Sequence, residues 1–123
     1  MIIRLSSFLL LLMAVPVQAA ETPVFALQYD VWSVPRRAET LIGMPALRGA
    51  VQALGEVPGS RLILRYPGGD AGTLWVNELE SWLVALGVPR ERIEKTPGSA
   101  DPRRIELEIR RPLGVGSGGG GDA

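Results

Sequence analysis

Residues 61–109 read RLILRYPGGDAGTLWVNELESWLVALGVPRERIEKTPGSADPRRIELEI and decide the fold. They begin with a short apolar segment, residues 61–66, which is typical of a β-strand. Leu62 and Leu64 would lie on one face of this strand and Ile63 on the other. Because apolar residues occupy both faces, the pattern predicts a central strand that is buried on both sides.

An amphipathic helix is expected after the turn formed by residues 67–72. Its apolar residues recur at the spacing of a single helical stripe: Trp75, Leu79, Trp82, Leu83 and Leu86. Asp70 or Thr73 can supply the N-terminal cap, and Gly87 is a natural C-terminal stop. The stripe predicts that both tryptophans of this helix belong to the core.

Two further strands are expected after the helix. Residues 92–96 form a short edge strand, and residues 97–102 form a turn rich in Pro, Gly, Ser and Asp. Residues 104–110 alternate between apolar and charged side chains over their whole length. This alternation predicts a strand with one buried face and one charged, solvated face.

The region before residue 61 supplies a strand and a helix. Residues 24–34 alternate with the period of a strand, and Pro35 ends the pattern. Residues 36–43 suggest an irregular or short helical connection, and the apolar spacing after Pro45 predicts a helix over 45–54. The sequence therefore predicts an α+β sandwich in the order β-α-β-α-β-β, with a mixed sheet of about four strands and two helices packed on one face.

Both ends of the chain differ in composition from the middle. Residues 1–19 combine Arg4, a short apolar run and small residues before Ala19, which is typical of a secretory signal peptide cleaved after Ala19. Residues 112–123 are rich in glycine, and we expect a disordered tail. This leaves residues 20–111 as a single domain.

Export and charge limit the functions that the protein can have. The chain contains no cysteine, so disulfides and a lipid-anchored cysteine are excluded, and an arginine-rich exported chain without disulfides suits a bacterial periplasm. Without Arg4, 12 basic residues face 13 acidic ones. This balance argues against nucleic acid or a membrane surface as partner, and we expect no membrane span after cleavage of the signal peptide.

Several segments of the chain resemble the OmpA-like peptidoglycan-associated domain: LILRY (62–66) before GDAG (69–72), WLVALGVPRERI (82–93) and RRIELEI (103–109). The resemblance implies the same α/β fold over most of the exported domain. In that family an Asp after the central strand and an Arg one helical segment later hold the diaminopimelate of peptidoglycan. Asp70 matches the Asp, but no arginine lies between Arg65 and Arg90.

Four residues are candidates for ligand binding. Asp70 can orient a cationic ligand or simply close its own turn, and Gly72 belongs to a turn that can expose backbone amides to an anion. A peptidoglycan clamp would need Asp70 together with an arginine from elsewhere, either Arg65 or Arg36. An exposed Tyr29 or Trp32 is a further candidate for stacking on a sugar or a partner surface.

Catalysis is not expected. The chain has no His and no Cys, which removes the commonest general base, the thiol nucleophile and the usual zinc ligands, and no cofactor or metal is predicted. We expect a non-catalytic binding or adaptor module of the bacterial cell envelope, with a protein as its partner. The alternatives are a peptidoglycan-binding domain and, from the enzyme class, a carboxylate-dependent hydrolase.

Overall fold

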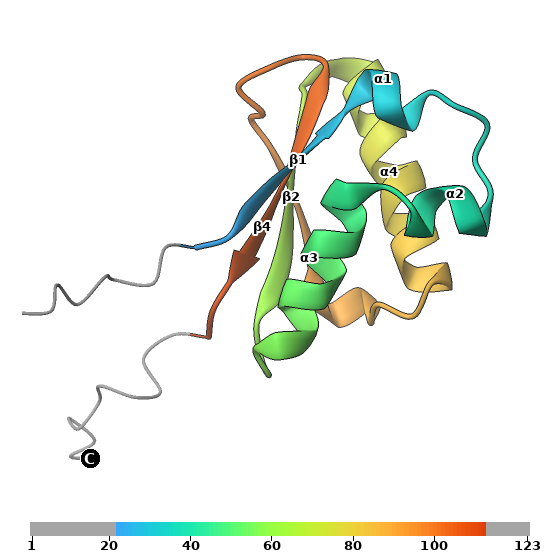
Figure 1. Cartoon of the computed structure of the whole chain (residues 1–123). Coiled ribbons are helices and arrows are strands. Elements are labelled where there is room, and N and C mark those ends of the chain that lie inside the picture. The colour runs from blue at the N-terminus through green and yellow to red at the C-terminus, as the bar shows by residue number, and fades with distance from the viewer. Residues whose placement is uncertain (1–21, 113–123) are drawn as a thin grey trace, which may run out of the picture.

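A four-stranded sheet and four α-helices make up the part of the chain that the computed structural model describes, residues 22–112 (Figure 1). The strands are β1 (Val24–Gln28), β2 (Arg61–Tyr66), β3 (Ile93–Pro97) and β4 (Arg104–Arg110). The helices are α1 (Tyr29–Trp32), α2 (Ala38–Ile42), α3 (Pro45–Glu56) and α4 (Gly69–Ala85), and a single 3₁₀ turn, Arg90–Arg92, precedes β3. This architecture confirms the predicted α+β class with a small mixed sheet.

The sheet has the strand order β1-β4-β2-β3. β4 lies antiparallel to both β1 and β2, whereas β2 and β3 are parallel. Parallel neighbours require a crossover connection, and α4 provides it. β1 and β3 are therefore the two edges of the sheet.

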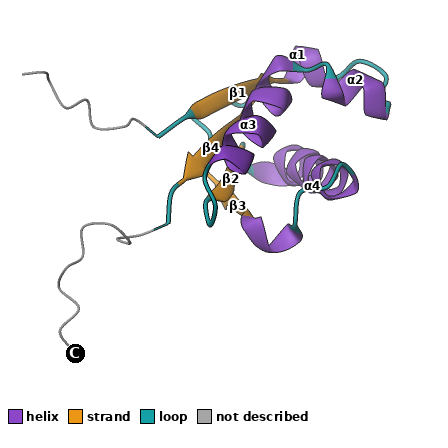
Figure 2. Cartoon of the chain, turned by 60° about the horizontal axis from the view of Figure 1, so that its bottom comes forward, coloured by secondary structure: helices purple, strands orange, loops and turns teal. Residues whose placement is uncertain are grey.

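All the helices lie on one face of the sheet, as Figure 2 shows. Alternate strand residues point into the core beneath them, among them Leu62 and Leu64 of β2 and Leu107 of β4, each with no exposed surface. The predicted stripe of α4 is buried through Trp75, Leu79 and Leu83, together with Val76. Trp82 packs only partly against the core, and Leu86 is exposed.

The other face of the sheet is covered by charged side chains instead of helices. Ile63 lies on this face and is only 1% exposed, which confirms the prediction that β2 is buried on both sides. Arg65 donates a hydrogen bond to the carboxylate of Glu108 at 2.8 Å, and Arg110 lies 3.4 Å from the same carboxylate. Paired charges thus form the solvated surface of the domain.

The ion pair of Arg65 and Glu108 predicts a pH dependence of stability. The hydrogen bond from Arg65 holds the pKa of Glu108 below its ordinary value. A carboxylate whose pKa is lower in the folded protein than in the unfolded chain stabilises the fold at pH values above its unfolded pKa. This stabilisation is lost as the pH falls through the pKa of the folded state. As the pH is lowered from about 5 to about 3, we expect the wild type to lose more of its free energy of unfolding than Glu108→Gln, which lacks the carboxylate.

Urea unfolding at a series of pH values measures this difference. Glu91→Gln is the matched control, because Glu91 is exposed and forms no ion pair within residues 22–112. Parallel pH profiles for the wild type and Glu108→Gln would contradict the prediction.

Two local predictions are wrong. The first strand ends at Gln28 instead of continuing to residue 34, because the chain turns into α1. α4 begins at Gly69, with Gly68 as its N-cap residue, and no side chain caps it. Thr73 instead donates a hydrogen bond to the Gly69 carbonyl within the helix.

The connection over residues 36–43 contains α2, in agreement with the expected short helical segment. The proposed signal peptide and most of the Gly-rich tail lie outside the described residues. Within residues 22–112, no helix is both long and apolar enough to cross a membrane.

Candidate binding site between α1 and α4

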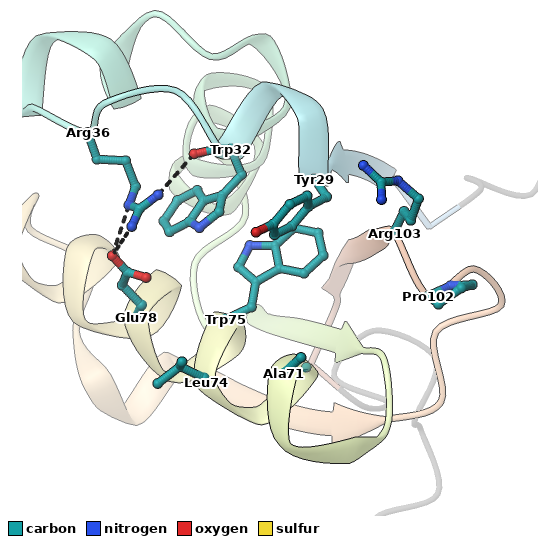
Figure 3. A pocket seen from close by; sticks show the side chains of 10 residues that line it. Tyr29, Trp32, Arg36, Ala71, Leu74, Trp75, Glu78, Pro102 and Arg103 are labelled. Carbon is teal, nitrogen blue, oxygen red and sulfur yellow. Dashed lines mark hydrogen bonds and ion pairs between the residues drawn. The ribbon is translucent and has the colours of Figure 1, made fainter.

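A pocket of about 430 Å³ opens between α1, α4 and the loop that connects β3 to β4 (Figure 3). Three aromatic rings, two arginines and one carboxylate dominate its lining. The lining residues are Tyr29, Trp32, Arg36, Ala71, Gly72, Leu74, Trp75, Glu78, Pro102 and Arg103. Three segments that are far apart in the sequence therefore meet at this site.

The aromatic wall forms because the chain leaves the sheet at Gln28. The Tyr29 amide still donates a hydrogen bond to the Arg103 carbonyl at 2.8 Å, and this bond ties the start of α1 to the beginning of β4. The rings of Tyr29 and Trp75 meet edge to face, with centroids 5.3 Å apart and an interplanar angle of 82°. Trp32 is buried in the core, whereas Tyr29 is 43% exposed.

Arg36 and Glu78 form an ion pair on one side of the pocket. The Arg36 guanidinium lies 2.6 Å from the Glu78 carboxylate and donates a second hydrogen bond to the Trp32 carbonyl at 3.2 Å. It also lies over the Trp32 ring, 4.8 Å from the centroid. These contacts join the segment after α1 to the middle of α4 and neutralise both charges locally.

Arg103 occupies the opposite side of the pocket. Its guanidinium pairs with the Asp30 carboxylate and lies over the Tyr29 ring, 5.4 Å from the centroid. Both arginines of the site therefore have a carboxylate partner and an aromatic partner. The site is an aromatic pocket with paired charges at its rim.

The indole N–H of Trp75 is enclosed in the wall and has no hydrogen-bond acceptor among the described residues. An enclosed donor without an acceptor costs about 1–3 kcal/mol. The wall of the pocket thus contains one polar group whose bonding is incomplete.

The structure brings together two of the four predicted site residues. Arg36 and Gly72 both line the pocket. Arg65 lies on the opposite face of the sheet, where it pairs with Glu108. Asp70 is exposed in the first turn of α4 and forms no ion pair within the described part of the chain.

Gly72 is required at its position by close packing. A Cβ atom there would lie 1.8 Å from the carbonyl oxygen of Pro67 and 2.6 Å from its carbonyl carbon. No side chain fits at such distances, so the turn before α4 can approach the helix only because residue 72 is glycine.

Sequence reasoning missed the roles of Glu78 and Arg103 and the convergence of Tyr29, Trp32 and Trp75. The closely spaced aromatics at 29 and 32 were a usable signal, but the predicted strand placed them on opposite faces. In α1 these two side chains instead line the same pocket. Arg36 pairs with Glu78 and Arg103 with Asp30, so each arginine is neutralised by a residue that is distant in the sequence.

A second hollow of about 300 Å³ lies where α2 and α3 meet the end of α4. Its lining is almost entirely aliphatic: Leu41, Ile42, Leu47, Arg48, Val51, Gln52, Leu83 and Leu86. Ile42 is 55% exposed there. Within residues 22–112, no group of three or more Asp or Glu side chains is arranged to hold a metal ion.

Comparison with protein-family models found no match, and a search of curated proteins found no matching relative.

Proposed function

We propose that this protein is a non-catalytic binding module of the bacterial cell envelope, exported to the periplasm, and that its partner is a protein. The aromatic pocket between α1 and α4 receives side chains of that partner. The single observation that carries the proposal is the aromatic pocket itself, with its exposed apolar rim.

The lining of the pocket fits a protein ligand. Side chains that contribute most to a protein–protein interface commonly fill pockets of the partner, and this pocket offers an aromatic wall with a few polar groups at its rim. Tyr29 is 43% exposed and Leu74 is 72% exposed at the rim, so large apolar surfaces are available to a partner. Aromatic residues and arginine are enriched where proteins bind one another.

The paired charges support binding over hydrolysis. Among residues 22–112, Glu78 is the one acidic side chain in the lining, and it pairs with Arg36. Hydrolysis by carboxylates needs two such groups facing one substrate. The arrangement offers hydrogen-bonding groups for orientation and no pair of acids for proton transfer.

The peptidoglycan alternative retains one favourable observation. The Asp70 carboxylate is exposed and lies next to Ala71, which lines the pocket. The arginines considered for a clamp, Arg36 and Arg65, are both paired with glutamates. A clamp around Asp70 would require one of these ion pairs to break.

Site-specific photocrosslinking in the periplasm of the native host tests the proposal. With a benzophenone amino acid at position 74, we expect an adduct of larger mass that digestion with lysozyme does not remove. The matched control places the same amino acid at position 91, which is exposed and does not belong to the pocket lining. Equal adducts at both positions would contradict the proposed site.

Sedimentation with isolated peptidoglycan sacculi separates the two candidate ligands. We expect the exported domain, residues 20–123, to remain in the supernatant, because neither Arg36 nor Arg65 is free to complete a clamp with Asp70. Co-sedimentation that Asp70→Ala abolishes would instead establish the cell wall as the ligand.

A further inference from the structure

The two edges of the sheet differ in how they are protected. Natural edge strands commonly carry charges or proline, which prevent pairing with another strand. β3 follows this rule, because it contains Glu94, Lys95 and Pro97. β1 has the sequence VFALQ, with no charge and no proline. Among the residues that the structure describes, β1 is therefore an unprotected edge, and Figure 2 shows it at the outer margin of the sheet.

The register of β1 against β4 shows which backbone groups point away from the sheet. The Tyr29 amide bonds the Arg103 carbonyl, and the Ile109 amide bonds the Pro23 carbonyl at 3.0 Å. Odd-numbered residues of β1 thus pair with β4, and hydrogen bonding in an antiparallel pair alternates along the strand. The amides of Val24, Ala26 and Gln28 and the carbonyls of Val24 and Ala26 consequently point outward.

A small cavity lies beside this edge. It has a volume of about 180 Å³, and β1, α1 and the start of α3 surround it. Its lining residues are Ala26, Leu27, Gln28, Val31, Met44, Pro45 and Ala46. Leu27 and Met44 are buried, whereas Val31 is 44% exposed. The cavity is suited to one apolar side chain of a strand that runs along β1.

We propose that the edge of β1 binds an extended, uncharged segment of a partner protein as a fifth strand, and that this segment places one apolar side chain in the cavity beside Ala26. In this mode of recognition, backbone hydrogen bonds supply affinity and pockets for alternate side chains supply specificity. Both features are present at β1 and lie side by side.

Charge and size identify the occupant. Neither β1 nor the lining of the cavity carries a charge. A charged side chain in the cavity would lose water and gain no counter-charge, so the complementary segment is uncharged. A second copy of the chain would contribute only the five residues of its own β1 to the paired strands. A stable interface uses about 20–30 residues on each side. A peptide ligand does not need so large an interface, because backbone hydrogen bonds along the strand and one filled pocket supply its affinity and specificity. A peptide segment that also fills the cavity is therefore the better fit.

A random phage-displayed peptide library, panned against the exported domain, is the probe. We expect it to yield uncharged peptides with alternating apolar residues. A synthetic peptide of this kind should slow hydrogen exchange at the amides of Val24, Ala26 and Gln28 by more than about tenfold. Methylation of alternate peptide nitrogens should abolish this protection, because it removes the backbone donors.

Two variants of the protein test the two halves of the site. Ala26→Pro removes one outward N–H, and proline is tolerated on an edge strand at such a position. Ala46→Leu fills the cavity without touching the edge. Each should weaken peptide binding by about tenfold or more. If Ala26→Pro fails to fold, as judged by circular dichroism, Ala46→Leu decides the test.

Leu74→Ala separates this proposal from the proposed function. Leu74 belongs to the aromatic pocket, so its replacement should leave peptide binding at β1 unchanged. The proposal would be overturned by a library selection that yields no binding peptide, or by peptides that protect the amides of α4 from exchange instead of those of β1. It would also be overturned by a dimer in solution that Ala26→Pro dissociates.

Discussion

Replacement of Gly72 by alanine is expected to destabilise the domain by about 3 kcal/mol or more. The new Cβ atom would meet the carbonyl oxygen of Pro67 at 1.8 Å. The oxygen belongs to the backbone, and the position of a Cβ atom is fixed by the backbone of its own residue, so neither atom can turn aside as the end of a flexible side chain would. The turn between β2 and α4 would have to move, and this movement would pull α4 away from the core. Chemical unfolding monitored by tryptophan fluorescence measures the loss.

Gly55→Ala is the matched control for this prediction. Gly55 also lies within a helix, α3, and a Cβ atom there has no neighbour within 4 Å. Alanine is favoured over glycine in helices by about 1 kcal/mol, so this variant should be slightly more stable than the wild type. Equal stabilities of Gly72→Ala and the wild type would show that the turn relaxes freely, and would reopen a direct binding role for Gly72.

The elements that were predicted correctly are those whose signals are local. β2 matches the predicted strand 61–66, and β4 matches the predicted strand 104–110. Alternation of apolar and charged residues defines β4, and a short apolar run bounded by a turn defines β2. The same reasoning extended the first strand too far, because alternation continues through Tyr29 and Val31. Gln28 pairs with Arg104, the first residue of β4, so the sheet offers no further strand partner beyond this point.

The aromatic pocket could not be predicted in the same way, because its defining contacts join distant parts of the chain. Arg36 and Glu78 are 42 residues apart, and Asp30 and Arg103 are 73 residues apart. Sequence analysis identified Arg36 and Gly72 as site residues. It placed Arg65 in the same clamp, although the direction of that side chain follows from pairing of β2 with β4.

Replacement of Arg92 by alanine is expected to lower the free energy of unfolding by about 2–3 kcal/mol. The Arg92 guanidinium donates hydrogen bonds to the carbonyls of Leu54 at 2.9 Å, Val57 at 3.3 Å and Ser60 at 3.0 Å. Leu54 lies in the last turn of α3, and Val57 is the C-cap residue. Since a helix leaves its last carbonyls without internal partners, a cation that binds them stabilises the helix end.

Arg90→Ala is the control for this prediction, because it removes the same side chain two positions earlier. The Arg90 side chain is 63% exposed and contacts Glu80 at 3.1 Å, and Glu80 keeps Lys95 as a second partner at 3.2 Å. Glu80 is largely buried, but it keeps its bond to Lys95 when Arg90 is removed, and the Arg90 end of the pair is exposed to solvent. We therefore expect this variant to lose about 0–1 kcal/mol. If both variants lost the same stability, the Arg92 bonds would be replaceable by water, and the end of α3 would owe its position to the buried side chain of Leu54 instead.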